Sequence, residues 1–195
     1  MDGFEKRKEQ KKESIRRAAL ELFQSYGFQK VSIGEIARRA GVSQVTIYNH
    51  FDSKEGLVRD VIKWHTLGLL DKYMEIMNGE QSFPEKLESI VFDKYRVVGE
   101  FQGELLQTII RDDPELRGFM ETLYQNEINP AMVKFFDEGI RQGYISPNIS
   151  METILLYFEI VRHGLWDVPD IYEQVNKKPG LLKELIALIT YGLNG

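Results

Sequence analysis

Apolar residues recur every three or four positions along most of the chain, which is the period of an amphipathic helix. Over residues 15–26 they form one apolar face, and Gly27 follows where a left-handed C-cap ends a helix. Capping residues, glycines and prolines predict further helices near 33–40, 44–50, 54–77, 83–98, 101–111, 114–142, 151–166 and from 179 onward. No stretch alternates as a strand does, so we predict an all-α fold of about nine helices.

One of these predicted helices contains a proline. Pro130 lies inside the segment 114–142, and a proline within a helix removes a backbone hydrogen bond and clashes with the preceding turn. We therefore expect a kink or a break near Asn129. Asp112 and Asp113, which precede this segment, are better explained as helix-capping residues than as a pair of catalytic carboxylates.

Two short helices joined by a tight turn are predicted over residues 33–51. Ser32 and Glu35 have the spacing of a capping box, which starts the first helix. Gly41 supplies the positive φ needed at the corner, and Ser43 is a good N-cap for the second helix. This arrangement is typical of a helix-turn-helix, although an ordinary helical hairpin in an α-bundle has the same spacing.

The second short helix carries hydrogen-bonding side chains of middle size and no acidic residue. They are Gln44, Val45, Thr46, Tyr48, Asn49 and His50. Amides and hydroxyls of this kind can hydrogen-bond the edges of DNA bases, and a valine suits a thymine methyl group. A helix that enters a groove lined with phosphates should carry no acidic side chains, because the phosphates would repel them. The alternative is that these side chains simply face water.

Charge is distributed unevenly along the 195 residues, whose formal net charge is −5. Residues 1–60 contain 12 Lys and Arg against 9 Asp and Glu, whereas residues 61–195 contain 13 against 21. A basic N-terminal part on an acidic remainder indicates that the two parts meet different partners. The alternative is that the Lys and Arg side chains near the N-terminus only solvate a helix, because the excess of positive charge is modest.

Composition excludes several classes of site. The chain has no cysteine, which excludes thiol nucleophiles, disulfides and thiolate zinc sites. No group of His, Asp and Glu has the spacing of metal ligands, and no catalytic or nucleotide-binding motif is present. The N-terminus does not resemble a secretory signal, and no apolar run is long enough to span a membrane. We expect a cytoplasmic protein that is not an enzyme, with no cofactor, metal or membrane partner.

The region from Phe23 to Leu57 resembles the N-terminal domain of the TetR (tetracycline-repressor-like) transcriptional regulators. The matching positions are Phe23, Gly27, Phe28, Val31, Ser32, Ile33, Glu35, Ile36, Ala37, Ala40, Gly41, Val42, Ser43, Thr46, Ile47, Tyr48, His50, Phe51, Ser53, Lys54, Glu55 and Leu57. The motif is long and ordered, and the resemblance covers about residues 10–60. Beyond it, only the helical character and length of the chain are similar to the family.

The resemblance implies a sequence-specific repressor that binds a palindromic operator in double-stranded DNA as a homodimer and is released by a small-molecule effector. It implies a three-helix DNA-binding domain over residues 1–52 and a larger helical domain for ligand binding and dimerisation over 53–195. Dimerisation through the last two helices suits their apolar spacing, although part of each face must pack inside the protomer. The alternative is a helical small-molecule-binding protein that no longer reads DNA.

The family's DNA contacts can be transferred to matching positions. Tyr48, His50 and Lys54 resemble phosphate contacts, whereas Gln44, Val45, Thr46 and Asn49 match positions that face bases. Ser32 and Ser43, at the starts of the two short helices, complete the predicted DNA-binding set. Gly34 has no side chain where some members place a DNA-contacting residue, so base contact from the first short helix is not expected.

Candidate ligand contacts in the larger part are aromatic residues and two polar residues of one helix. They are Trp64, Phe92, Tyr95, Tyr124, Phe136, Arg162 and His163. Each aromatic residue could instead belong to an ordinary core, because aromatic side chains dominate most cores. The two polar residues could instead face solvent or a dimer partner.

Overall fold

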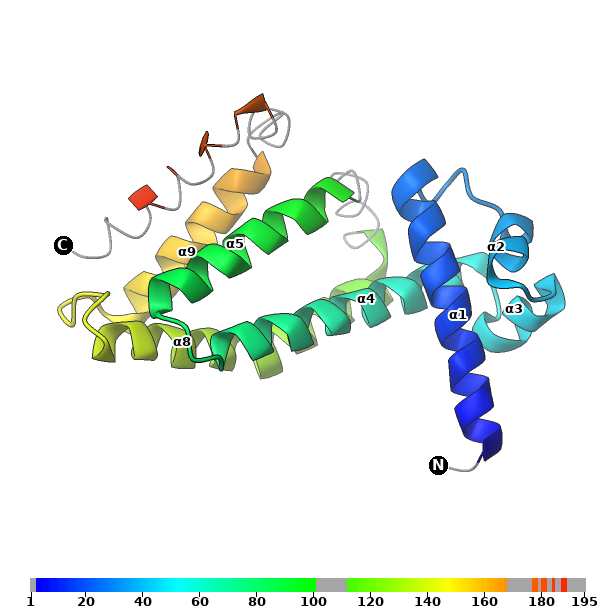
Figure 1. Ribbon diagram of the computed structural model, residues 1–195, viewed down its shortest axis with the longest axis horizontal. Coiled ribbons are helices and arrows are strands. Elements are labelled where there is room, and N and C mark those ends of the chain that lie inside the picture. Colours follow the sequence, from blue (N-terminus) through cyan, green and yellow to red (C-terminus); the bar gives the residue numbers. More distant parts are fainter. Residues whose placement is uncertain are drawn as a thin grey trace. The chain divides into compact units, whose positions relative to one another are not determined.

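The structure is a computed structural model that describes residues 3–100 and 112–167 and, further on, residues 177, 178, 180, 181, 184, 187 and 188. Its elements are α1 (Gly3–Tyr26), α2 (Ile33–Ala40), α3 (Gln44–Phe51), α4 (Lys54–Met77), α5 (Phe83–Glu100), α7 (Pro114–Leu123), a π-helical turn (Tyr124–Ile128), α8 (Asn129–Arg141) and α9 (Met151–Asp167) (Figure 1). The described elements are all helical, which confirms the predicted all-α class. The helices predicted over 101–111 and from 179 onward lie outside these elements.

Local capping chemistry sets the helix boundaries in the N-terminal part. Gly27 adopts a φ of 81°, so α1 ends at the residue before it. Both halves of the predicted capping box are formed at α2, since the Glu35 N–H donates to Ser32 Oγ (3.3 Å) and the Ser32 N–H donates to Glu35 Oε2 (2.8 Å). Gly41 ends α2 with a φ of 69°, as predicted.

The chain divides into two compact units. The first unit combines residues 1–69 with 100–119, and the second combines residues 70–99 with 120–195. The first unit therefore contains the predicted helix-turn-helix and also the first part of α4 and the beginning of α7. The predicted domain boundary between residues 52 and 53 stays a prediction.

A continuous apolar core holds the first unit together. Its buried members come from α1, α2, α3, α4 and the loop before α2, joined by one residue of α7: Ile15, Ala19, Phe23, Phe28, Val31, Ile33, Ile36, Ala37, Ile47, Phe51, Leu57, Val61, Ile62 and Leu116. Ile47 of α3 is fully buried, and Val42 at the corner packs against the same core. These two contacts fix the crossing of α2 and α3.

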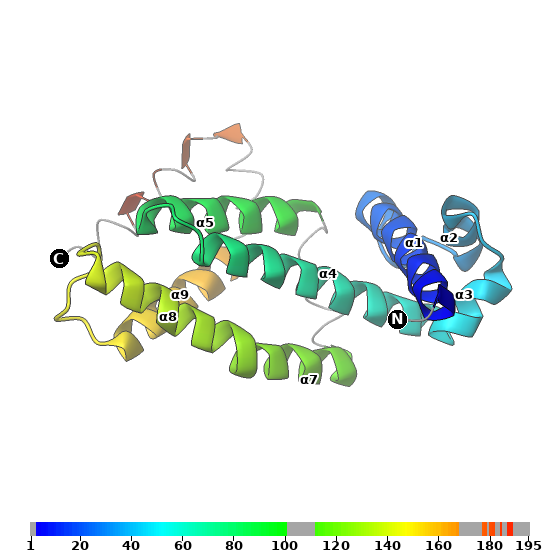
Figure 2. The same ribbon diagram turned by 60° about the horizontal axis from the view of Figure 1, so that its bottom comes forward.

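Aromatic packing organises the second unit, in which α8 and α9 lie side by side (Figures 1 and 2) and the start of α5 contacts α8 through Phe83. The Phe83 ring lies 4.7 Å from that of Phe135, and the Phe136 ring lies 4.4 Å from that of Phe158. Gly139 of α8 permits this packing, because a Cβ there would lie 2.9 Å from the Phe83 ring.

The predicted interruption near Asn129 takes the form of a π-helical turn between α7 and α8 (Figure 2). The Asn129 N–H donates to the carbonyl of Tyr124, five residues earlier. Pro130 follows at the start of α8 and has no N–H to continue the α-helical pattern. The wider turn accommodates the proline, so the helical conformation continues from α7 into α8 without a loop. No helix of the described residues is long and apolar enough to cross a membrane.

Candidate nucleic-acid interface

The α3 helix presents a polar surface that the core of the first unit supports from behind. Ile47 and Phe51 are its buried residues. On the opposite side, Val45 is 66% exposed and Tyr48 is 46% exposed, and Gln44 and Asn49 are also exposed. The four outward residues share one short, firmly seated helix. A rigid helix with hydrogen-bonding side chains and no acid can enter the major groove of DNA.

Ser43 and Thr46 form hydrogen bonds that stabilise the start of α3. The Thr46 N–H donates to Ser43 Oγ at 3.1 Å, and the two hydroxyl oxygens lie 2.8 Å apart. Ser32 plays the same part at α2, where its hydroxyl donates to the Glu35 carboxylate at 2.6 Å. This hydrogen bond and that of the Ser32 N–H keep the pKa of Glu35 below its usual range. Ser32 and Ser43 therefore position the two helices, and their own contact with DNA stays a prediction.

Gln44 lies against the first turn of α2 because Gly34 leaves room for it. A Cβ built at Gly34 would lie 3.3 Å from Nε2 of Gln44. That distance is shorter than an ordinary van der Waals contact, so a side chain at residue 34 would press on the amide. Gly34 thus shapes the α3 surface although it offers no side chain of its own.

His50 lies at the end of α3 in a partly buried position. Its Nδ1 atom is buried and has no hydrogen-bond partner among the described residues. Burial, followed by the positive charges of Lys12, Lys8 and Lys11, lowers the pKa of His50 below its ordinary 6.5. The imidazole is therefore neutral at pH 7, and it can act as a hydrogen-bonding group rather than as a cation.

Lys54 begins α4 next to this surface. Its Nζ donates to the carbonyl of Gln29 at 3.2 Å, which holds the ammonium beside the loop between α1 and α2. A lysine at the start of a helix adds its charge to the positive end of the helix dipole. The predicted phosphate contact by Lys54 stays a prediction, as does that by Tyr48.

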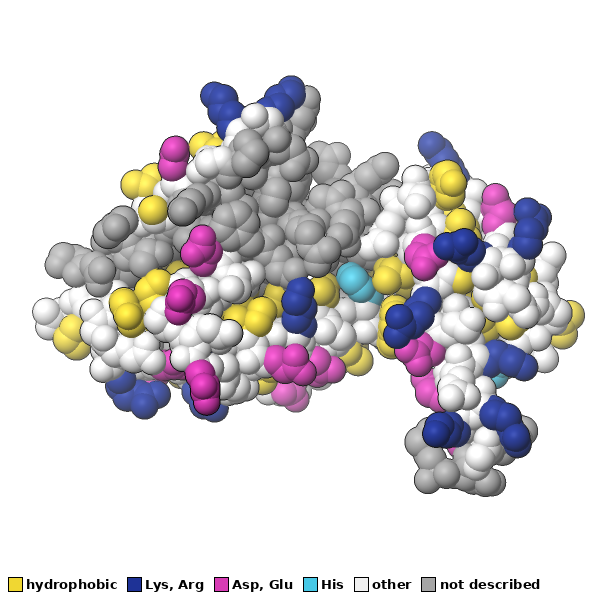
Figure 3. Space-filling view, in the orientation of Figure 1, with side chains coloured by type: hydrophobic (Ala, Val, Ile, Leu, Met, Phe, Trp, Pro, Cys, Tyr) yellow, Lys and Arg dark blue, Asp and Glu magenta, His cyan; other side chains and the backbone are white. Residues whose placement is uncertain are grey.

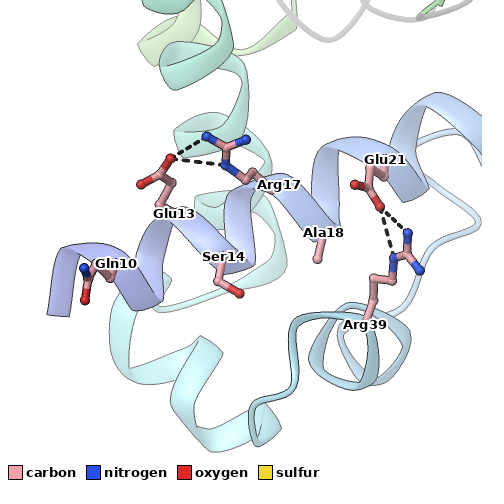
Figure 4. A pocket seen from close by; sticks show the side chains of 7 residues that line it. All are labelled: Gln10, Glu13, Ser14, Arg17, Ala18, Glu21 and Arg39. Atoms are coloured by element: carbon pink, nitrogen blue, oxygen red, sulfur yellow. Dashed lines mark hydrogen bonds and ion pairs between the residues drawn. The ribbon is translucent and has the colours of Figure 1, made fainter. Parts of the chain in front are cut away.

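A polar groove of about 500 Å³ runs between α1 and α2 on another face of the first unit (Figure 4). Two ion pairs line it, one within α1 from Arg17 to Glu13 and one from Arg39 of α2 to Glu21 of α1, each with a closest approach of 2.6 Å. Because their charges are matched by carboxylates, these arginines add little to the attraction of DNA.

Three lysines near α3 are absent from the sequence-predicted set. Lys8, Lys11 and Lys12 are the cations whose charges lower the pKa of His50. Their spacing relative to the buried Ile15 is the signal that could have identified them, since residues three, four and seven positions apart share one face of a helix.

The candidate ligand residues do not form one described site. Trp64 is half-buried in the first unit, and Tyr124 is 38% exposed in the π-helical turn. Phe136 is 2% exposed and packs inside the aromatic cluster of the second unit. The side chains of Phe92, Tyr95, Arg162 and His163 lie outside the described residues. Their part in ligand binding stays a prediction. No cluster of His, Asp or Glu in the described part of the chain could hold a metal ion.

Comparison with known proteins places this geometry in a family. The model of bacterial regulatory proteins of the tetR family matches residues 15–61, which run from α1 through α3 into α4. The repressor KstR2 of Rhodococcus jostii is 26% identical over 76% of this chain and 72% of its own length. The regulator UidR of Escherichia coli is 26% identical over 77% of this chain and 76% of its own.

The fold extends this likeness beyond the N-terminal part. The crystal structure of the transcriptional regulator FadR from Bacillus subtilis, in complex with stearoyl-CoA, aligns with a TM-score of 0.65. The alignment covers 92% of this chain and 97% of FadR, at 20% identity. With the helix-turn-helix and its exposed α3, the sequence matches identify the chain as a DNA-binding transcriptional regulator whose N-terminal domain, over residues 15–61, is that of the tetR family of bacterial regulatory proteins.

Proposed function

We propose that the protein is a repressor that binds a palindromic operator as a homodimer and leaves it when a small molecule binds the helical part of the chain. The observation that carries this proposal is the outward face of α3, where Gln44, Val45, Tyr48 and Asn49 are exposed together without an acid. Base edges in the major groove are read by such groups. The proposal places the protein in the cytoplasm with DNA and assigns it no catalytic step.

Exposed apolar residues of α9 support the homodimer. Leu156 is 56% exposed and Ile160 is 61% exposed, one helical turn further along the same face. Ile154 is fully buried within its own protomer, so the apolar pattern of this helix serves both an inner and an outer surface. Two helices that meet through such a patch form a two-fold symmetric interface.

Coupling between effector and DNA requires two conformations of the protein. One must bind DNA more tightly, and the other must bind the effector more tightly. A dimer that reads two half-sites needs its α3 helices about 34–36 Å apart. An effector that favours another spacing weakens DNA binding, and DNA weakens effector binding by the same factor. Stearoyl-CoA, which is bound in the structure of FadR from Bacillus subtilis, is a sensible first probe among ligands that carry a long acyl chain.

The decisive experiment is DNA binding with selected and scrambled duplexes. A duplex enriched by the full-length protein from a random library would be titrated by fluorescence anisotropy beside a scrambled duplex of equal length. We expect tighter binding to the selected duplex, two protomers per duplex, and a steep loss of affinity with salt. Equal affinity for both duplexes would contradict sequence reading and favour a ligand-binding protein without DNA readout. Addition of stearoyl-CoA tests one effector in the same titration.

A further inference from the structure

The buried face of α1 continues beyond the core as a row of lysines. Ile15 is fully buried, and Lys12, Lys11 and Lys8 lie three, four and seven positions before it. At about 3.6 residues per turn these three lysines share the side of α1 that carries Ile15. Lys6 lies nine positions before Ile15, about two and a half turns away, and so occupies the opposite side.

This row lies beside the end of α3. The Lys12 ammonium is 6.0 Å from the centre of the Phe51 ring. Lys8, Lys11 and Lys12 are close enough to His50 for their charges to act on it, as described above. The face of α1 that packs on the core therefore also carries positive charge to the edge of the candidate interface. Figure 3 shows Lys and Arg side chains at the N-terminal end of α1, among others that are spread over the first unit.

These lysines differ from the other cations of α1 in their partners. Arg16 is bound by Glu9 at 2.6 Å and by Asp60 at 2.5 Å, and Arg17 is paired with Glu13. Within the described part of the chain, Lys8 and Lys11 have no ion-pair partner, and both are exposed. Exposed cations that no carboxylate neutralises are the ones available to phosphates.

We propose that Lys8 and Lys11, with Lys12 beside Phe51, form a second DNA-backbone contact that extends the interface past the end of α3. A lysine ammonium is a flexible point charge, so this contact adds affinity and orientation but no sequence information. The inference rests on the proposed DNA binding, and it adds a surface outside the helix-turn-helix to it.

The test uses a double variant that carries both Lys8→Ala and Lys11→Ala. Its control is the variant Lys6→Ala, on the opposite side of α1. Each phosphate contact that is lost lowers the magnitude of the log–log salt slope by about 0.9, so the double variant loses about 1.8 per bound protomer. Its affinity should fall by a similar factor for the selected and the scrambled duplex. Lys6→Ala should leave both the slope and the affinity close to those of the unchanged protein. Circular dichroism and thermal unfolding establish that every variant is folded.

Two outcomes overturn the inference without touching the proposed function. One is a double variant that binds the selected duplex with an unchanged salt slope. The other is an equal loss of slope in Lys6→Ala, which would mean that the first turns of α1 act only through overall charge. If the unchanged protein shows no preference for a selected duplex, the proposed function fails instead. A second measurement shortens the selected duplex at both ends, and the difference between the double variant and the unchanged protein should then disappear.

Discussion

Arg59 of α4 and Asp113, the residue before α7, form an ion pair in which Nε and Oδ2 lie 2.6 Å apart across 54 positions of sequence. The same carboxylate caps α7, because its Oδ1 accepts the N–H groups of Glu115 and Leu116 at 3.0 Å each. Leu116 is fully buried in the core of the first unit. One side chain thus starts a helix and also attaches it to α4.

Replacement of Asp113 should therefore destabilise the protein. Loss of a helix N-cap costs about 0.5–2 kcal/mol, and the Arg59 contact is lost with it. We expect Asp113→Ala to lower the free energy of unfolding by an amount within that range or slightly above it. Urea denaturation, monitored by circular dichroism, measures this change. Asp137→Ala, which removes an exposed ion pair with Arg141, should change it by less than about 0.5 kcal/mol. Equal effects of the two variants would contradict the assigned role of Asp113.

The stability conferred by Asp113 should disappear in acid. Hydrogen bonds from the Leu116 N–H and then from Arg59 hold the pKa of Asp113 below its ordinary value of 3.8. The folded state therefore binds this proton less readily than the unfolded state, so the contribution is complete above the unfolded pKa and is lost as the pH falls toward the folded one. Urea midpoints measured from pH 6 to pH 2.5 should fall less steeply for Asp113→Asn than for the unchanged protein. Parallel curves would contradict this linkage.

Helix boundaries could be predicted from the sequence because capping is chemistry between near neighbours. Ser32, Glu35 and Gly41 act within a few residues of one another, and the structure forms each of their predicted contacts. The interruption before Pro130 could be predicted for the same reason, although its π-helical form could not, since that depends on how the chain on both sides is held.

Contacts between distant segments could not be predicted in this way. The periodicity of α7 indicates an apolar face, but it does not indicate that Leu116 completes a core built mainly from residues 15–62. The lysine row of α1 could be predicted only in part. Its spacing relative to Ile15 is visible in the sequence, whereas its closeness to His50 depends on how α1 crosses α3.

Substitutions on α3 and α4 should separate base reading from charge. Gln44→Ala and Asn49→Ala should each weaken binding to the selected duplex by roughly 1–3 kcal/mol, with little effect on scrambled DNA or the salt slope. Lys54→Ala should weaken both duplexes alike and lower the slope by about one. The measurement is anisotropy at several salt concentrations. If Gln44→Ala and Asn49→Ala weaken both duplexes equally, α3 does not read the sequence.

The dimer interface can be tested on α9. Leu156→Asp places a charge in the exposed apolar patch shared with Ile160, so it should shift the protein toward a monomer of 22.7 kDa. Leu67→Asp, at an exposed leucine of α4, is the matched control and should leave the dimer intact. Light scattering at micromolar concentration measures both. A monomeric unchanged protein would refute the dimer itself.

Gly34→Ala should stabilise the folded protein and at the same time weaken its binding to the selected duplex. Alanine is favoured over glycine within a helix by about 0.5–1 kcal/mol, so the free energy of unfolding should rise. The new Cβ would lie 3.3 Å from Nε2 of Gln44 and displace that amide, so affinity for the selected duplex should fall while affinity for scrambled DNA stays the same. In the background of Gln44→Ala, the same substitution should have no further effect on the selected duplex, because the displaced group is already gone. An additive loss in the double variant would show that Gly34 acts on DNA independently of Gln44.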